Sequence, residues 1–373
     1  MKIFERVNRP LLFSIAAVAI AASCQKPQDN LLEPDPLDDG TPVKVLLGTN
    51  VINATAKASG PLDKFNSTTL SIFAIDKAST DWTQGDPFLL KNYSVTTEAN
   101  LTSTPTSIET DKYYKDNVNY KFFGYYVDDL LHTDDKLTVG HDAVTLRVAI
   151  TGYEDILLAT TDEAEDYKVA QQTAQNNNQT FNTNRVYSAY SARRGVVPNL
   201  VFKHQLTRLD FVFKTGEAID ENTKVEVVGI AVGSVKNGLL TVAGDGQGLV
   251  PANENEVDLP LKYPTESAAL VMPSAKEGIA DFDGNGNSIM VYPKSDSYKL
   301  AIKIRQSKKV GEKWTSGPVE ERTFAIALSG AAAFEAGKKY EVTVITYGME
   351  PVIVGVKLSD WAVGENVTID SDK

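Results

Sequence analysis

Cysteine and histidine are scarce in this chain of 373 residues, which has one cysteine and three histidines. A single cysteine excludes an internal disulfide, and so few thiolate and imidazole ligands leave little material for a zinc site. Positive charge is also in deficit, because 37 Lys and Arg face 49 Asp and Glu, for a net charge of −12. An acidic chain without a basic tail is a poor partner for a polyanion. We therefore expect no nucleic-acid partner, no metal and no cofactor.

Long hydrophobic runs are also missing, apart from one near the N-terminus. Lys2, Arg6 and Arg9 precede the apolar run Leu11–Ser23. That run is shorter than the roughly 20 apolar residues that a transmembrane helix needs. Residues 1–23 therefore predict a secretory signal peptide that is removed from the mature protein.

The only cysteine stands where this signal would be cut. The stretch Ile20-Ala21-Ala22-Ser23-Cys24 resembles the lipobox of bacterial lipoproteins. The resemblance implies cleavage between Ser23 and Cys24, followed by a diacylglyceryl thioether and an N-acyl chain on Cys24. Several acyl chains make a stable anchor, so we expect a surface-exposed lipoprotein of the outer membrane. Residues 24–40, rich in Pro, Asp and Leu without period, predict a flexible tether.

Short segments of alternating hydrophobicity dominate the rest of the chain. In Thr207–Lys214, Leu209, Phe211 and Phe213 fall on one face, and the same period of two recurs in Tyr298–Arg305 and Tyr340–Thr346. Further strands are predicted, between Gly, Asn, Asp and Pro punctuation, at Val43–Leu47, Leu70–Ile75, Asn119–Val127, Val144–Ile150, Lys224–Val232, Ala268–Met272, Ser288–Tyr292, Thr323–Leu328 and Val352–Leu358. Such a density of half-buried strands predicts an all-β protein of antiparallel β-sandwich domains.

The composition shifts in Asp162–Asn184, which lacks alternating hydrophobics and predicts a long exposed loop. We place the boundary between two domains after it, giving an N-terminal β-sandwich of residues 41–194 and a C-terminal β-sandwich of residues 195–373. Arg193-Arg194 forms an accessible dibasic site at this boundary. Ala331–Ala336 predicts one helical turn, with Gly337 placed to end it.

Motifs for catalysis or nucleotide binding are absent: there is no serine-hydrolase elbow, no HExxH, no dinucleotide fingerprint and no complete P-loop. Gly244–Gly248 predicts a hairpin turn. Asp281–Gly286 imitates the start of a calcium loop, but Tyr292 stands where the bidentate Glu belongs. A plain β-turn is favoured there, with a calcium site as the alternative.

Carboxylate pairs such as Asp134-Asp135 and Glu163/Asp166 are expected by chance among 49 acidic residues. His132 and His141 flank loop-like sequence, and His204 is best explained as a hydrogen-bonded turn residue. We predict no catalytic residue and no enzyme activity. The aromatic residues of Tyr113-Tyr114 and Phe122–Tyr126 could stack on sugar rings, although a stripe facing the core is favoured.

Three stretches together resemble the fimbrillin family, the subunits of type V pili and related surface adhesin lipoproteins. They are Glu154–Ala159 (similar to the family's "D-L-L-x-A"), Leu200–Phe211 (similar to "F-x-H-x-L-x-[KR]-L-x-F"), and Phe334–Tyr340 followed by Val356–Ser359, Asp360-Trp361 and Gly364 (similar to "G-K-x-Y" and "D-W-x-x-G"). The resemblance implies two transthyretin-like β-sandwich domains, with Trp361 as a core anchor and His204 as a hinge hydrogen-bonder.

The resemblance also implies a role in cell adhesion and assembly with other pilin subunits by donor-strand exchange, with a host or bacterial surface receptor as a further partner. One feature departs from the family: shaft subunits are cut by an arginine-specific protease near the mature N-terminus, yet no arginine lies between Cys24 and Arg147. This favours an accessory, tip or anchor-like subunit, with Lys44, Lys57 or Lys64 as sites for another protease. The alternative function is a surface glycan-binding β-sandwich lipoprotein.

Overall fold

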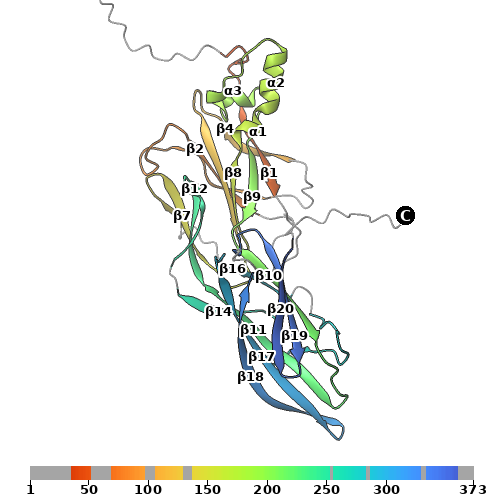
Figure 1. Ribbon diagram of the computed structural model, residues 1–373. Helices are drawn as coiled ribbons and strands as arrows, with labels where there is room; N and C mark the ends of the chain where they lie inside the picture. The colour runs from red at the N-terminus through yellow and green to blue at the C-terminus, as the bar shows by residue number, and fades with distance from the viewer. Residues whose placement is uncertain are drawn as a thin grey trace, which may run out of the picture. The chain divides into compact units, whose positions relative to one another are not determined.

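The structure is a computed structural model that describes residues 35–51, 69–96, 106–128, 137–252, 255–282, 286–328 and 333–359 (Figure 1). Four β-sheets account for most of these residues, and the helices are few and short. The prediction of an all-β protein built from antiparallel sheets is confirmed. Residues 40–373 form one compact unit by their contacts.

Sheet A has seven strands. Their order is β3 (Phe88–Thr96), β2 (Thr69–Asp76), β5 (Tyr120–Val127), β8 (Ile156–Thr161), β9 (Asn199–His204), β1 (Lys44–Val51) and β4 (Thr106–Tyr113). Neighbouring strands are antiparallel except for β1 and β9, which are parallel. β2 and β5 are nearly continuous runs of apolar and aromatic residues, as expected of strands buried on both faces.

Sheet B has four strands, in the order β13 (Gly248–Pro251), β12 (Asn237–Gly244), β7 (Ala143–Ala149) and β6 (Leu137–Val139). The chain reverses between β12 and β13 at Gly244–Gly248, so the predicted hairpin turn is confirmed. β7 pairs with β12, and β8 of sheet A pairs with β9. Each of these two pairings joins a strand before residue 194 to a strand after residue 195. The domain boundary predicted between these residues remains a prediction.

Sheets C and D are formed by the C-terminal half of the chain. Sheet C has the order β16 (Ser288–Val291), β10 (Thr207–Thr215), β19 (Lys339–Tyr347) and β20 (Glu350–Ser359). Sheet D has the order β14 (Glu256–Pro260), β11 (Thr223–Val235), β17 (Ser297–Val310) and β18 (Lys313–Ala327), with β15 (Leu270–Val271) also paired to β11. β10, β17 and β19 bury alternate residues, as their sequence pattern predicts.

Two apolar clusters pack against opposite faces of sheet A. Phe122 of β5 belongs to a cluster with Leu47 and Ile72, whereas its neighbour Phe123 belongs to a second cluster that includes Leu146 of sheet B. Successive side chains of a strand point to opposite faces, so β5 separates the two clusters. The second cluster continues through the inner faces of sheets C and D. The aromatic stripe of Phe122–Tyr126 therefore faces the core, as favoured from the sequence.

The first cluster is covered by the segment that the sequence presented as a loop. This segment and the residues after it, up to Ala192, hold four short helices: α1 (Glu163–Asp166), α2 (Lys168–Asn176), η2 (Thr183–Arg185) and α3 (Ala189–Ala192), the last of which lies beyond the predicted loop. Figure 1 shows α1, α2 and α3 gathered beside one end of the sheet A strands. The prediction of an exposed loop at Asp162–Asn184 is wrong in its secondary structure. Asp162 caps α1 through its side chain, and Phe181 is buried in the first cluster, which together order a polar sequence.

The expected strands are found, but several others carry too weak an alternation to be predicted. The strands with no counterpart among the predicted ones are β3, β4, β6, β8, β9, β12, β13 and β14. The helical turn at Ala331–Ala336 is not observed in its described part, since Phe334 instead makes an isolated β-bridge with Lys294. Gly337 does adopt a positive φ of 70° in the turn that precedes β19.

Candidate functional site

Strand β1 is the first candidate because it lies between two partners that come from distant parts of the chain. It pairs with β4 in antiparallel register and with β9 in parallel register, from Gly48↔Asn199 to Val51↔Phe202. Val45 and Leu47 of β1 are fully buried. β1 is thus held by main-chain pairing along both edges and by a small set of apolar side chains. A different strand with apolar residues at the same spacing could make the same contacts.

Strand β20 is the second candidate because it forms an edge of sheet C. In the described residues it pairs with β19 alone, so its other edge presents main-chain groups to a further strand. Leu358 is 53% exposed, and Val352 is also exposed. Glu350 at the start of β20 accepts a hydrogen bond from Arg322 of β18 at 3.1 Å. This contact covers the first part of the edge only.

Asp155 and His204 form a buried pair where β8 begins and β9 ends. His204 Nδ1 lies 3.0 Å from Asp155 Oδ1 and 2.9 Å from Oδ2, and each side chain is at most 2% exposed. Because the pair is closed to solvent, neither side chain can reach a substrate. Its geometry indicates a structural contact that holds the start of β8 to the end of β9. His204 is hydrogen-bonded, as the sequence predicts, although it is the last residue of β9 and not part of a turn.

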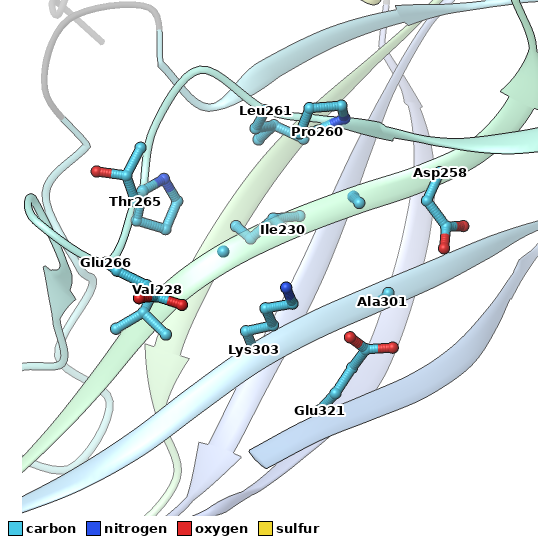
Figure 2. Close-up of a pocket in the computed structure, with 13 residues that line it drawn as sticks. Val228, Ile230, Asp258, Pro260, Leu261, Thr265, Glu266, Ala301, Lys303 and Glu321 are labelled. Carbon is cyan, nitrogen blue, oxygen red and sulfur yellow. The ribbon is translucent and has the colours of Figure 1, made fainter. Parts of the chain in front are cut away.

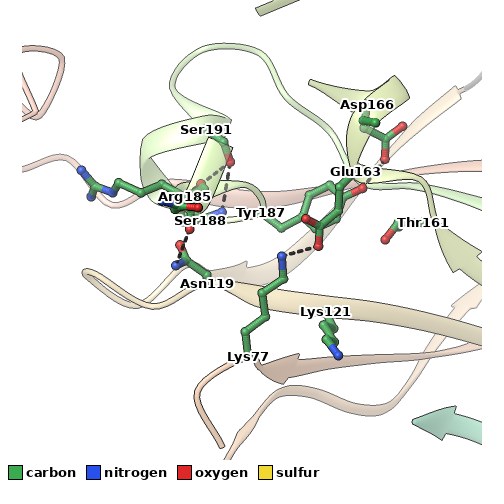
Figure 3. A network of polar contacts seen from close by, with 12 residues as sticks. Lys77, Asn119, Lys121, Thr161, Glu163, Asp166, Arg185, Tyr187, Ser188 and Ser191 are labelled. Carbon is green, nitrogen blue, oxygen red and sulfur yellow. Dashed lines mark hydrogen bonds and ion pairs between the residues drawn. The ribbon is translucent and has the colours of Figure 1, made fainter. Parts of the chain in front are cut away.

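Glu163 and Asp166 fasten the helical segment to sheet A (Figure 3). Glu163 forms an ion pair with Lys77, which follows β2. Asp166 Oδ2 accepts hydrogen bonds from the Tyr187 hydroxyl at 2.6 Å and from the Asn199 amide at 2.8 Å. Burial raises the pKa of the Asp166 carboxyl above its usual value, and these two hydrogen bonds oppose the shift. The two carboxylates therefore act on separate structural partners rather than as a catalytic pair.

The dibasic site lies against Tyr190 of α3. The Arg194 guanidinium lies 3.7 Å from the centroid of the Tyr190 ring and donates a hydrogen bond to the Tyr190 carbonyl at 2.8 Å. Arg185 lies 4.6 Å from the same centroid. Cation–π contacts of this kind hold the arginine side chains in place. The dibasic site is therefore part of an ordered helix end, which the sequence did not indicate.

A pocket of about 400 Å³ opens on sheet D (Figure 2). Its floor is the stretch Val228–Ala231 of β11 together with Ala301 of β17, and its wall is the chain from Asp258 to Glu266. The charged groups around it are those of Asp258, Glu266, Lys303 and Glu321. The alternation in Tyr298–Arg305 predicted an outward polar face for β17. That alternation did not predict that residues 258–266 would form a wall over that face.

Of the remaining residues singled out from the sequence, some are described by the structure and others are not. Ser23, Cys24, His132, Asp134-Asp135 and Trp361 lie outside the described residues, as do the central residues of the calcium-like stretch. His141 is exposed, as expected. Within the described part of the chain, no group of three His, Cys, Asp or Glu side chains is arranged to hold a metal ion. The helices described there are all too short and too polar to cross a lipid bilayer.

Comparison with known proteins matches a family model with the description fimbrillin-like to residues 57–361 of the chain. A fimbrial protein of Bacteroides vulgatus is similar in structure, at 14% identity and a TM-score of 0.49, over 85% of this chain and 99% of that one. The fimbrial anchor protein of Porphyromonas gingivalis is similar at 12% identity and a TM-score of 0.36, over 86% of this chain and 98% of that one. No protein with a curated description matches the chain.

Proposed function

Because this chain belongs to the fimbrillin-like family, we propose that it is a cell-surface lipoprotein that serves as an accessory, tip or anchor-like subunit of a pilus and contributes to cell adhesion. The observation that carries the proposal is the extent of the family match, which runs from residue 57 to residue 361 and so includes sheets B to D and every strand of sheet A except β1. The acidic charge and the scarcity of cysteine and histidine agree with a binding or structural protein rather than an enzyme.

The site of assembly in this proposal is the position of β1 in sheet A. A neighbouring subunit's strand would replace β1 between β4 and β9 and bury apolar residues where Val45 and Leu47 now lie. Main-chain pairing supplies affinity in such strand addition, and the apolar pockets supply register. Lys44 is the first residue of β1 and forms an ion pair with Glu109 of β4 at 3.0 Å. A cut after Lys44 would leave most of β1 in sheet A, so Lys57 and Lys64 are the better sites for releasing it.

Anchoring rests on Cys24 and the tether that follows it. A lipidated Cys24 that remains joined to β1 would keep β1 in its own sheet and favour an anchor or tip role. Removal of β1 would instead open sheet A and favour a polymerising subunit.

The test is the intact mass and N-terminal sequence of the protein from its native outer membrane, with negative-stain microscopy of the same sample. We expect acylated Cys24 on particles or at filament ends. A Cys24→Ala variant is the control, which should lose the acyl mass and the membrane fraction. A new N-terminus beyond residue 40 within continuous filaments would replace the accessory role with a shaft role.

Strand exchange is tested separately with a peptide of the β1 sequence, residues 43–52, and a chain beginning at residue 57. We expect the shortened chain to bind this peptide and the full chain to exclude it. A matched peptide carrying Leu47→Asp should not bind, because it would bury a carboxylate without a partner. Equal binding of both peptides would contradict exchange at the β1 position.

A further inference from the structure

We propose that the pocket on sheet D binds a neutral saccharide of one or two rings. The pocket is an assembled feature, since it draws on β11, β17, β18 and the chain after β14. Its volume of about 400 Å³ lies in the range of about 300–1,000 Å³ typical of small-molecule sites. The proposal adds a ligand to the adhesive role proposed above, and it does not depend on pilus assembly.

The floor is shallow because small residues occupy three of the four outward positions of two paired strands, the fourth being Lys303. Gly229 pairs with Lys303, and Ala231 pairs with Ala301. A side chain at Gly229 would lie 3.4 Å from Lys303 Cδ, so the aliphatic part of Lys303 runs beside the glycine. Val228, Ile230 and Ala301 are buried, so the accessible part of the floor is Gly229, Ala231 and the aliphatic part of Lys303. This surface suits the C–H face of a sugar ring.

The wall is fixed by hydrogen bonds to the floor and to the chain that follows it. The Leu261 amide donates to the Ile230 carbonyl at 2.8 Å, which ties the wall to the floor. The Thr265 amide donates to the Ala268 carbonyl at 3.0 Å, and the Tyr263 hydroxyl donates to the Ala269 carbonyl at 3.2 Å. A wall held in this way is formed before a ligand arrives, which lowers the entropic cost of binding.

The polar groups at the rim both donate and accept hydrogen bonds. Glu266, Glu321 and Lys303 are exposed, and Lys303 stands directly opposite Glu321 in the β17–β18 ladder. Asp258 is already bound to Lys299 at 2.9 Å. Carboxylates accept and an ammonium donates, so the set matches hydroxyl groups, which do both. An acidic ligand would meet the excess of carboxylates, which disfavours anions at this rim.

No aromatic side chain is among the lining residues of this pocket. The ring would therefore be held by hydrogen bonds and by contact with alanine, proline and leucine rather than by stacking. We expect weak, millimolar binding that becomes useful for adhesion when many copies act together.

The experiment is saturation-transfer NMR on the full mature chain. The probes are D-glucose, D-galactose, D-mannose and N-acetyl-D-glucosamine, with D-glucosamine and D-glucuronate as the charged comparisons. We expect signal from at least one neutral sugar. Filling the floor with Ala301→Phe should weaken it about tenfold, and Lys303→Met or Glu321→Gln about fivefold.

Glu312→Gln and Lys313→Met are the matched controls, because both residues are exposed in the β17–β18 hairpin and neither lines the pocket. They should leave the signal unchanged. Equal signals from the wild-type chain and from Ala301→Phe, Lys303→Met and Glu321→Gln would overturn the proposal, as would a preference for D-glucosamine or D-glucuronate. If Ala301→Phe does not fold, Lys303→Met and Glu321→Gln still decide the outcome. If the chain binds no sugar but exchanges the β1 peptide normally, the pocket proposal fails and the proposed pilus function stands. If it binds a sugar but does not exchange the β1 peptide, the pocket proposal stands and strand exchange fails.

Discussion

The ring of Phe202 on β9 lies over Gly124 on β5, although β8 runs between these two strands. A Cβ atom at Gly124 would come within 2.7 Å of Phe202 Cζ. The two residues lie in one row across sheet A, because Gly124 pairs with Ala159 and Ala159 pairs with Phe202. Small side chains at two successive positions of this row therefore make room for one large ring.

We expect Gly124→Ala to lower the free energy of unfolding by about 1–3 kcal/mol, because the added methyl group overpacks the row. Chemical denaturation measures this loss. In the Phe202→Leu background the cost of Gly124→Ala should shrink. Gly355→Ala is the control, since no atom lies within 4 Å of its added Cβ. An equal cost with and without the Phe202 ring would contradict the steric account.

The buried pair of Asp155 and His204 predicts a large stability effect from the loss of one partner. His204→Ala leaves the Asp155 carboxylate buried without its imidazole, which costs about 3–5 kcal/mol in comparable buried pairs. Denaturant unfolding of this variant should show the loss directly. His141→Ala is the matched control, because His141 is exposed and should change stability little. A loss for His204→Ala no larger than that control would show that the pair does not fasten β8 to β9.

Asp166 predicts a pH dependence of stability. Burial raises the pKa of its carboxyl in the folded chain, so the folded state binds this proton more tightly than the unfolded state does. Stability should therefore fall as pH rises from the ordinary aspartate range through the raised pKa. Denaturation of the wild-type chain and of Asp166→Asn between pH 3.5 and 7, values that bracket the usual aspartate pKa of about 3.9, measures the difference.

The wild-type chain should lose stability relative to Asp166→Asn across this rise in pH. Glu165→Gln, at an exposed neighbouring position, should follow the wild-type profile. A difference between wild type and Asp166→Asn that stays constant with pH would contradict the raised pKa.

The packing of Arg194 on Tyr190 predicts resistance to trypsin at the dibasic site. Cleavage requires a locally extended chain, and the contact with the Tyr190 ring and carbonyl opposes that opening. Mass spectrometry during limited proteolysis should find other sites cut first. Tyr190→Ala should expose Arg193-Arg194 to rapid cleavage. Fast cutting of the native chain at this site would show that α3 opens readily.

The sequence predicted the strands in which apolar and polar residues alternate strongly. It did not predict the strands whose structure depends on pairing with neighbouring strands. β10 and β19 alternate along their whole length, and β17 does so in part, because one face of each is buried and the other is wetter. β4 and the first half of β18 carry mostly exposed polar residues, so their pairing partners decide their structure. The helices after Asp162 escaped prediction for a similar reason, since Phe181 and Tyr187 order them from a distance.

The site residues divide in the same way. His204 was recognisable as a hydrogen-bonded residue, but its partner Asp155 lies 49 positions earlier and no local pattern pairs them. The pocket on sheet D joins residues from 228 to 321. The alternation in β17 predicted that Lys303 faces outward, but it did not predict the other rim residues or the wall.

The sequence by itself determined the all-β class and the family, because both rest on local composition, period-two alternation or short motifs. It also predicts a secretory N-terminal segment, which stays a prediction. The tertiary structure alone decided that β1 lies between β4 and β9, that Phe202 lies over Gly124, and that Asp258 to Glu266 form the wall of a pocket. These are contacts between residues far apart in the chain. They depend on which strands pair and in what register. The hydrophobic pattern within one strand restricts its register but does not determine which strand it pairs with.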